Sequence, residues 1–369
     1  MHFNNPELLE DPYPHYKKWR EEKPIWWAED VGGGGLSRYD DVRTILKDAS
    51  LFSSNSMGEM DQQAMALPLL TDDPPSRTLK HMEAEVASLV EELLDDMAGK
   101  TVIDISEDFT IPLPVYIIAR LMGIPEDRAE DFKRWSDALT GTSEAASLEE
   151  RLPDIMEMAT YFGSLIPERR ENPGDDLISK VVQAEVDGVG ISDEDIVGFN
   201  ILLLIAGNET TTNLLSNLLN HLADHPEKWD ELRDNPDKIE AAVEETLRFD
   251  GPVHWVNRKA TADTEFHGQK VKAGDIVYAI LGAANRDADH YDNPDEFRLD
   301  RGRGDHHTFG HGIHFCIGAP LGRLEARYAL EGLFRRYKSI RHAEQASNER
   351  THSTMLRGFH HLWFQVEPA

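Results

Sequence analysis

The chain has almost no cysteine and no long hydrophobic run. Cys316 is the one cysteine among 369 residues, which excludes an internal disulfide and a zinc site built from several cysteines. The longest apolar stretch, Ile201–Ala206, is far shorter than the roughly 18 residues that a membrane span needs. The first residues lack the basic start and apolar core of a secretory signal. We therefore expect a soluble, cytoplasmic protein with no membrane as a partner.

Basic residues are scarce relative to acidic ones. The sequence has 38 Lys and Arg against 68 Asp and Glu, a formal net charge of −30. A charge of this sign is repelled by the phosphates of nucleic acids and anionic lipids, so neither is expected as a partner. The excess fits an ordinary acidic protein. It also favours adaptation to high salt, where screening weakens self-repulsion.

The hydrophobic pattern predicts one compact domain, residues 1–369, that is mostly α with a smaller β portion. The most informative helix is predicted from Asp193 to about Ala223. Ser192 is a suitable N-cap, and the apolar centre of the helix indicates that it passes through the middle of the protein. The other predicted elements are helices at Glu83–Met97, Asp154–Ile166, Asp176–Val186 and Ala319–Tyr337, and strands within Val271–Ile280.

Two segments are predicted to be irregular. Gly32–Gly35 has no Lys-Ser/Thr pair after it, so it is interpreted as a turn and not as a phosphate loop. Asn55–Leu70 has little periodicity and is typical of a loop that covers a substrate pocket. Apolar residues such as Leu203, Val253 and Val256 indicate that this pocket is mostly hydrophobic.

The surroundings of Cys316 indicate a chemical role for this residue. Gly310, Gly312 and Gly318 flank it, and glycine permits tight turns and a close approach of the backbone to a flat group. A helix is predicted directly after the cysteine, and the N–H groups at its N-terminus should stabilise a thiolate and lower the thiol pKa. A thiolate in such a bend is a suitable ligand for haem iron, because it donates electron density for O–O cleavage.

The run Phe309–Gly318 resembles the haem-binding loop of the cytochrome P-450 family, Phe-x-x-Gly-x-His/Arg-x-Cys-x-Gly, at every defining position. The resemblance implies that family's fold, a helical haem domain with a long central helix, and haem b (iron protoporphyrin IX) as cofactor. It implies that Cys316 is the metal ligand. The other residues of the loop that it assigns to haem binding are Phe309, Gly310, His314, which would meet a propionate, and Gly318.

A second match lies midway along the long predicted helix. Ala206–Thr211, with the sequence Ala-Gly-Asn-Glu-Thr-Thr, resembles the family's oxygen-activation motif. Gly207 beside polar residues is unfavourable in an apolar helix, which predicts a bulge that opens a groove for dioxygen beside Ala206 and Gly207. The resemblance makes Thr210 and Glu209 the catalytic residues, the first as a hydrogen-bond donor and the second as a proton relay. The plainer alternative is a packed threonine and a solvated glutamate.

Glu245 and Arg248 resemble the family's Glu-x-x-Arg pair, whose role is structural. Their i,i+3 spacing places both on one helix face. Where an arginine often completes a triad with this pair, the chain has Glu296. Either Arg298 or Arg301 substitutes for that arginine, or only a pair forms.

Three further residues are implied to bind haem propionates. Arg258 follows Gly251-Pro252-Val253 and fits the family's propionate-binding arginine. Arg77 and His81 lie where the usual histidine and arginine are exchanged, and both can still donate hydrogen bonds. The next predicted helix begins sooner than is usual in the family, so the helix that carries Arg77 and His81 is expected to be short.

Histidines cluster before Cys316 and raise the alternative of a separate metal site. They are His306, His307, His311 and His314. No His-Glu-x-x-His signature accompanies them. We therefore interpret all but His314 as surface or loop residues.

The resemblance implies a haem-thiolate monooxygenase that inserts one oxygen atom of dioxygen into a small hydrophobic organic substrate. No flavin or iron–sulfur signature is present, so the electrons should come from a separate ferredoxin and reductase. Glu209 and Thr210 disfavour two alternatives, a peroxide-driven oxygenase or isomerase and a haem sensor. Basic residues near the last helix form either a docking face for an acidic ferredoxin or ordinary ion pairs: Arg323, Arg327, Arg335, Arg336, Lys338 and Arg341.

Overall fold

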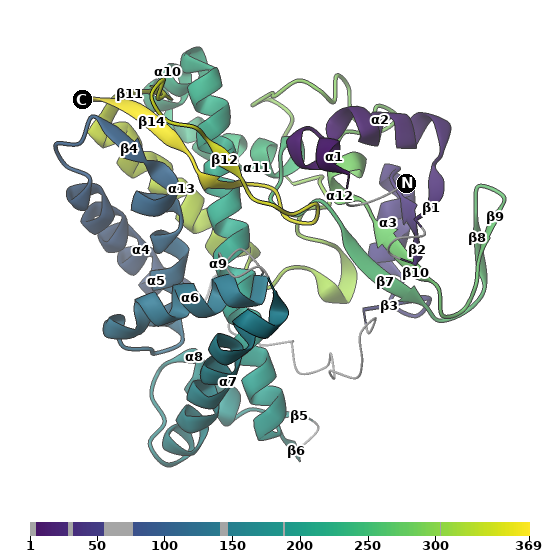
Figure 1. Ribbon diagram of the computed structural model, residues 1–369, viewed down its shortest axis with the longest axis horizontal. Coiled ribbons are helices and arrows are strands. Elements are labelled where there is room, and N and C mark those ends of the chain that lie inside the picture. The colour runs from purple at the N-terminus through teal and green to yellow at the C-terminus, as the bar shows by residue number, and fades with distance from the viewer. Residues whose placement is uncertain (1–4, 29–31, 55–76, 141–146, 187–188, 303) are drawn as a thin grey trace.

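Helices make up most of the chain, as the hydrophobic pattern predicts. The computed structural model describes residues 5–28, 32–54, 77–140, 147–186, 189–302 and 304–369. The loop expected at Asn55–Leu70 lies outside these ranges. Figure 1 shows a larger helical part on one side of the molecule and a smaller part, with a five-stranded sheet, on the other.

The elements are as follows. The helices are α1 Pro6–Glu10, α2 Tyr13–Glu22, α3 Tyr39–Lys47, α4 Arg77–Asp96, α5 Pro112–Leu121, α6 Ala129–Thr140, α7 Leu148–Glu171, α8 Leu177–Val182, α9 Asp193–Asp224, α10 Pro226–Asp234, α11 Ile239–Phe249, α12 Leu281–Ala284 and α13 Ala319–Arg336. Shorter turns are the π-helix η3 Ser106–Thr110 and the 3₁₀ turns η4 Glu126–Arg128, η5 Pro236–Lys238 and η6 Gly312–His314. The strands are β1 Ile25–Ala28, β2 Gly33–Leu36, β3 Phe52–Ser53, β4 Val102–Asp104, β5 Glu185–Val186, β6 Val189–Gly190, β7 Val256–Ala260, β8 Thr264–Phe266, β9 Gln269–Val271, β10 Ile276–Ala279, β11 Tyr337–His342, β12 Glu349–Arg350, β13 Phe359–His361 and β14 Trp363–Pro368.

Helix α9 is the central element, and its prediction is confirmed. It has 32 residues, and the Ser192 hydroxyl accepts a hydrogen bond from the Asp195 N–H at 3.1 Å, as an N-cap does. Helices α5, α6, α7, α11 and α13 all pack against it. The bulge expected near Gly207 is wrong, because α9 is α-helical throughout. The Thr210 hydroxyl instead donates to the Ala206 carbonyl at 2.7 Å, a bond that a helix accommodates without a change of register.

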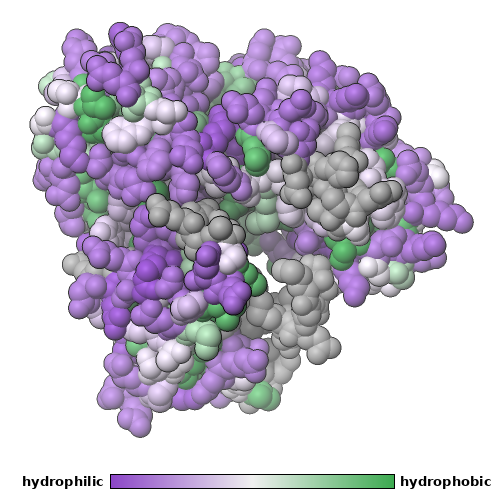
Figure 2. Space-filling model, viewed as in Figure 1, coloured by the Kyte–Doolittle hydropathy of each residue, from purple (hydrophilic) through white to green (hydrophobic). Residues whose placement is uncertain are grey.

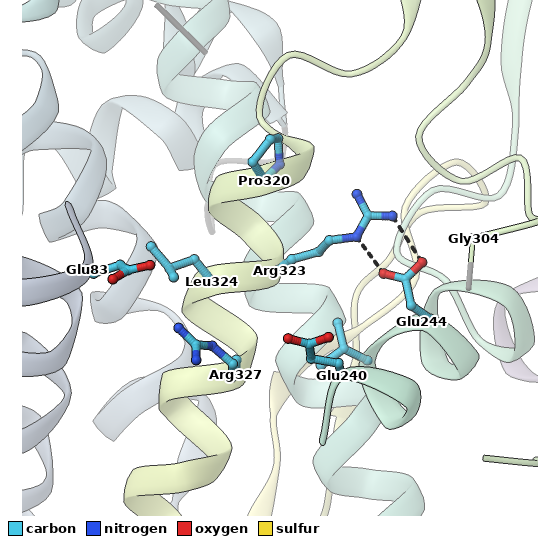
Figure 3. A pocket seen from close by; sticks show the side chains of 9 residues that line it. Glu83, Glu240, Glu244, Gly304, Pro320, Arg323, Leu324 and Arg327 are labelled. Atoms are coloured by element: carbon cyan, nitrogen blue, oxygen red, sulfur yellow. Dashed lines mark hydrogen bonds and ion pairs between the residues drawn. The ribbon is translucent and has the colours of Figure 1, made fainter. Parts of the chain in front are cut away.

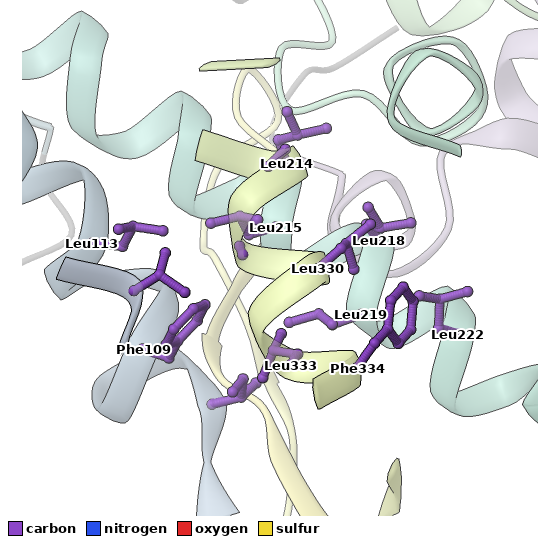
Figure 4. Packing of buried hydrophobic residues seen from close by; sticks show 14 of the residues in the cluster. Phe109, Leu113, Leu214, Leu215, Leu218, Leu219, Leu222, Leu330, Leu333 and Phe334 are labelled. Carbon is purple, nitrogen blue, oxygen red and sulfur yellow. The ribbon is translucent and has the colours of Figure 1, made fainter. Parts of the chain in front are cut away.

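The largest apolar cluster joins α9 to α4, α11, α13 and η3. Figure 4 shows leucines of α9 and α13 that interdigitate, with Phe109 and Leu113 on one side and Phe334 on the other. These side chains are 8% exposed or less. The cluster fixes the start of α13, which follows Cys316, against the C-terminal half of α9.

The glycine run at residues 32–35 forms strand β2, so the predicted turn is wrong beyond Gly32. Strand β2 pairs antiparallel with β1 and parallel with β10 in the sheet β1-β2-β10-β7-β3. A β-carbon at Gly35 would overlap the ring of Trp26, and one at Gly33 would overlap the ring of Tyr278. Glycine is therefore needed here because neighbouring aromatic rings lie across the strand.

The other predicted elements hold with shifted ends, with two exceptions. Arg77 and His81 were expected on a short helix of their own, but they lie at the start of the 20-residue helix α4. The predicted helix Asp176–Val186 ends at Val182, and Glu185–Val186 forms a short strand. Figure 2 shows hydrophilic side chains over most of the visible face, with apolar residues in small separate patches. Within the described ranges, no helix combines the length and the low charge that crossing a membrane requires.

Candidate active site

The loop that carries Cys316 is a tight double bend. The Cys316 N–H donates to the Phe309 carbonyl at 2.8 Å, which closes the loop. Gly310 and Gly312 have φ values of 70° and 69°, a region that favours glycine. The bend therefore depends on these glycines and holds the cysteine at its end.

The sulfur of Cys316 lies at the N-terminus of α13. The backbone N–H groups of Gly318 and Ala319 and the charge of Arg323 all act to lower the pKa of the thiol and so favour the thiolate. Burial nevertheless raises the pKa of the thiol and outweighs these contributions, so the expected lowering is not seen for the free side chain. A coordinated metal ion deprotonates such a thiol outright, so the donors fit a metal-bound thiolate.

The oxygen-motif segment of α9 meets the helix that follows Cys316. A β-carbon at Gly322 of α13 would lie 3.5 Å from the Thr211 hydroxyl of α9. Ala206 is exposed and Thr210 is partly exposed. Gly207 faces α5, where a β-carbon would lie 2.9 Å from the Ile118 side chain, so this glycine permits close helix packing.

Glu209 lies on the side of α9 that faces α6. Burial, with the negative charge of Asp137, raises its pKa to about 7, and the positive charge of Lys133 opposes the rise. Asp137 and Lys133 form an ion pair of 3.2 Å on α6. The sequence did not single out these two residues, because an acid and a base four positions apart are ordinary on a helix surface.

Asn208, next to Glu209, is buried and was also missed. Its side-chain amide donates to the Ser136 hydroxyl of α6 at 3.0 Å. Thr212 donates to the Thr110 carbonyl at the end of η3, also at 3.0 Å. The signal in the sequence was the series of polar residues, i and i+4, within an otherwise apolar helix.

Glu245 and Arg248 form a buried cluster, and the structure decides which arginine completes it. Arg248 donates to both carboxylate oxygens of Glu245 at 2.8 Å. The Arg301 guanidinium donates to Glu245 at 3.0 Å. Arg298 contributes only its backbone N–H, at 2.8 Å, while its side chain binds Asp300. The cluster is therefore a triad with Arg301 as its third member.

Arg258 and His314 provide hydrogen-bond donors beside the loop. The Arg258 Nε is buried without a hydrogen-bond partner, and burial lowers the pKa of this side chain. Burial and the nearby charge of Arg258 lower the pKa of His314. An orphaned buried donor beside a histidine fits a haem carboxylate. Arg77 begins α4 and His81 follows one turn later, but their side chains lie outside the described part of the structure.

The histidines before the cysteine bind protein groups. His307 contacts the Tyr39 carbonyl at 3.0 Å and His311 at 2.6 Å, and burial lowers the pKa of His307 to about 3. His306 approaches Glu244 at 3.4 Å. Among the described residues, no group of three or more His, Cys, Asp or Glu is placed to hold a metal ion.

Most of the basic residues near α13 are engaged with acidic neighbours. Figure 3 shows Arg323 bound to Glu244 across a cavity of about 610 Å³ between α4, α11 and α13, with Arg327 and Glu240 also on its wall. Further along α13, Arg335 and Arg336 pair with Glu91, and Arg336 also with Asp95. This pattern favours ordinary ion pairing over a free basic face.

Comparison with known proteins assigns the family. The family model described as cytochrome P450 matches residues 38–358. A putative cytochrome P450, YjiB, of Bacillus subtilis is 39% identical over 87% of this chain and 86% of its own length. The erythromycin C-12 hydroxylase of Saccharopolyspora erythraea is 36% identical, over 92% of each chain.

Solved structures support the same family assignment. The cytochrome P450 CYP109Q5 of Chondromyces apiculatus superimposes with a TM-score of 0.89 at 32% identity, over 100% of this chain and 98% of that one. CYP109E1 of Bacillus megaterium, in complex with testosterone, superimposes with a TM-score of 0.87 at 35% identity, over 96% of this chain and 99% of that one. The chain belongs to the cytochrome P450 family. It is an oxidoreductase, a monooxygenase that uses haem b and dioxygen to oxidise an organic substrate.

Proposed function

We propose that Cys316 is the axial thiolate ligand of this monooxygenase and that residues 1–369 act as one haem domain. The observation that supports this most strongly is the loop closed by the Cys316 N–H on the Phe309 carbonyl at 2.8 Å, which places the cysteine just before the N-terminus of α13, where backbone N–H groups favour a thiolate. Bound haem b supplies an iron centre that accepts electrons and activates dioxygen. The chain supplies the anionic ligand, the shape of the pocket and the protons.

The remaining predicted residues have separate tasks in this proposal. Glu209 holds a proton near neutral pH. The partly exposed Thr210 hydroxyl, which donates to the Ala206 carbonyl in this structure, turns away from that carbonyl to donate a hydrogen bond where oxygen is activated. Arg258 and His314, with Arg77 and His81, hold the propionates by charge-assisted hydrogen bonds. The residues assigned to backbone contact with the haem are Phe309, Gly310 and Gly318 on the loop and Ala206 and Gly207 on α9.

The substrate is proposed to be a small hydrophobic organic molecule. Leu203, Val253 and Val256 are partly buried apolar residues at the edges of two core clusters, which supports an apolar pocket wall. One similar protein is an erythromycin C-12 hydroxylase, and another was solved in complex with testosterone; both compounds are bulky organic molecules. Electrons are proposed to come from a separate ferredoxin and reductase in the cytoplasm.

The absorption spectrum of the reduced holoprotein with carbon monoxide tests the ligand. We expect a strongly red-shifted Soret band, typical of thiolate ligation, and its loss in Cys316→Ala. Haem content, measured after extraction, separates loss of the ligand from loss of the haem. His307→Ala serves as a control, because that histidine binds only protein groups, and it should keep the band. A histidine-type band in the unchanged protein would overturn the assignment.

A further inference from the structure

Helix α2, near the N-terminus, places two tyrosine hydroxyl groups among residues from the second half of the chain. The Tyr13 hydroxyl donates to the Asp250 carboxylate, and the Tyr16 hydroxyl lies 2.9 Å from Nδ1 of His254. These partners are 237 and 238 residues further along the chain. Helix α2 also packs against α12, as Figure 1 shows. The N-terminal helix is therefore joined to the segment that follows α11.

The partners of the two tyrosines flank Val253, which is proposed above for the wall of the substrate pocket. His254 is the next residue, and Asp250 comes three residues earlier. Side chains alternate along an extended segment, so His254 and Val253 point to opposite sides. In agreement, Tyr16 belongs to one apolar cluster and Val253 packs against another. The position of Val253 therefore depends on what holds His254.

A second extended segment pairs with this one. Val253 forms an antiparallel bridge with Leu356, and the Arg357 N–H donates to the Pro252 carbonyl at 2.9 Å. The Arg357 side chain donates through Nε to the Asp250 carboxylate at 2.8 Å. The carboxylate that α2 contacts thus holds both segments. Two short segments with one bridge have little stability of their own, so their position depends on such outside contacts.

The contact between Tyr16 and His254 is buried. These side chains are 4% and 2% exposed, and burial lowers the pKa of His254 to about 3, so its imidazole is neutral. Its Nε2 has no hydrogen-bond partner among the described residues, which leaves Tyr16 as its side-chain partner. A β-carbon at Gly282 would lie 3.1 Å from the Tyr16 ring and 3.2 Å from the His254 ring, so this glycine permits the contact.

The Tyr13 ring is also held in place. The Arg286 guanidinium group lies over this ring, 3.4 Å from its centroid, and over the Phe249 ring at 3.7 Å. Arg286 also donates to the Phe249 carbonyl at 2.8 Å. Because Phe249 ends α11, the stack connects α2 with the helix that carries Glu245 and Arg248.

We propose that Tyr13 and Tyr16 are positioning residues that fix the pocket wall at Val253 and Leu356, and that they thereby determine how tightly bulky ligands bind in the haem pocket. The inference rests on the proposed pocket wall. It adds a determinant of ligand affinity on the N-terminal helix, whose side chains act through Asp250 and His254.

Titration of the ferric holoenzyme with two nitrogen ligands provides the test. Imidazole is small and reports access to the iron, whereas 4-phenylimidazole also places a phenyl ring in the pocket. Both are followed by the shift of the Soret band. Tyr13→Phe and Tyr16→Phe each remove one hydrogen bond and keep the ring. Each should weaken 4-phenylimidazole binding by about three- to tenfold and leave imidazole binding unchanged.

Two further variants separate positioning from general stability. Tyr337→Phe makes the same change at a buried tyrosine on β11, in a different apolar cluster, and should change neither affinity. A merely structural role would lower the stability of Tyr16→Phe without changing the ratio of the two affinities. If Tyr16 acts through Val253, the variant that combines Tyr16→Phe with Val253→Ala should bind 4-phenylimidazole about as weakly as the weaker single variant.

The outcomes separate this inference from the proposed pocket wall. Weaker 4-phenylimidazole binding in the tyrosine variants and in Val253→Ala, with effects that do not add, supports both. If Val253→Ala weakens binding but neither tyrosine variant does, or if the effects add, the inference is overturned and the wall stands. If only the tyrosine variants weaken binding, the assignment of Val253 to the wall is overturned and α2 acts through Leu356. If none of the three changes the affinity, both are overturned.

Discussion

Two glutamates in this protein, Glu245, which is buried, and Glu209, which is partly buried, have opposite surroundings. The Glu245 side chain is 3% exposed and that of its partner Arg248 is 4% exposed. Glu245 accepts hydrogen bonds from two guanidinium groups and one backbone N–H. Glu209 faces one cation and one anion across a cavity with room for water, and its pKa is raised to about 7. The first charge is compensated by fixed partners, and the second is only partly compensated.

The difference separates a structural charge from an exchangeable proton. A carboxylate whose oxygens accept hydrogen bonds from several fixed donors holds its neighbours in place. A carboxylate that is short of donors titrates near neutral pH and can transfer protons during turnover. The glutamate of the triad therefore belongs to the framework of the fold, and the glutamate of α9 has the proton affinity that its proposed role requires.

The largest effect is expected from breaking the compensated cluster. Arg248→Ala leaves the Glu245 carboxylate buried without its main partner, which should lower the free energy of unfolding by about 3–5 kcal/mol. Arg298→Ala is the matched control, because its side chain binds exposed Asp300 and its removal should leave the free energy of unfolding nearly unchanged. Both are measured by denaturant unfolding of the haem-loaded protein. Equal losses in the two variants would contradict the assigned difference.

A smaller effect is expected at Glu325, an uncompensated acid on α13. This side chain is 2% exposed, one carboxylate oxygen has no hydrogen-bond partner among the described residues, and burial raises its pKa to about 8. Protonated Glu325 contributes its full stability below pH 4.5, and that stability is lost as the pH rises through about 8. Glu325→Gln should therefore match the stability of the unchanged protein at low pH and exceed it above pH 8, because the neutral amide avoids the cost of a buried carboxylate.

Unfolding of both proteins across this pH range provides the measurement. Glu240→Gln, a change of the same kind at an exposed position of α11, should show no such pH-dependent gain. A constant difference between the Glu325 variant and the unchanged protein at all pH values would mean that Glu325 is not protonated in the folded state.

The smallest effect concerns the uncompensated charge of the whole surface. With a net charge of −30, self-repulsion should destabilise the protein at low salt, and screening should restore about 1 kcal/mol at high salt. Thermal unfolding in low and high concentrations of potassium chloride measures this, with sucrose as an uncharged control for solute exclusion. Equal or greater stability at low salt would rule out the interpretation of the composition as high-salt adaptation.

The sequence predicted what depends on local spacing. The loop around Cys316, the long helix with its Ser192 N-cap and the Glu245–Arg248 pair all lie within short stretches whose geometry follows from periodicity and glycine positions. What it could not supply depends on distant packing. Arg301 rather than Arg298 completes the triad because of the way the chain turns between Asp292 and Arg301, where the Arg301 side chain also binds the Asp292 and Asn293 carbonyls.

The errors have the same origin. Local conformational preference predicts a turn at Gly32–Gly35, but Gly33–Gly35 lie in a strand with the rings of Trp26 and Tyr278 against it. Local conformational preference predicts a bulge near Gly207, but this glycine lies in a regular helix with Ile118 of α5 packed against it. In both cases tertiary contacts, and not local conformational preference, decide what the glycine does.

Strand β2 shows how a missing side chain can orient a ring. Because Gly33 and Gly35 present only backbone, the indole of Trp26 and the phenol ring of Tyr278 occupy the space above the strand that other residues would fill. Strand β2 therefore contributes hydrogen bonds to the sheet, while side chains of its neighbours β1 and β10 form the surface of the sheet over it. A methyl group added at Gly35 would displace the ring of Trp26, and one added at Gly33 would meet both the ring of Tyr278 and the backbone carbonyl of Ile276 on β10.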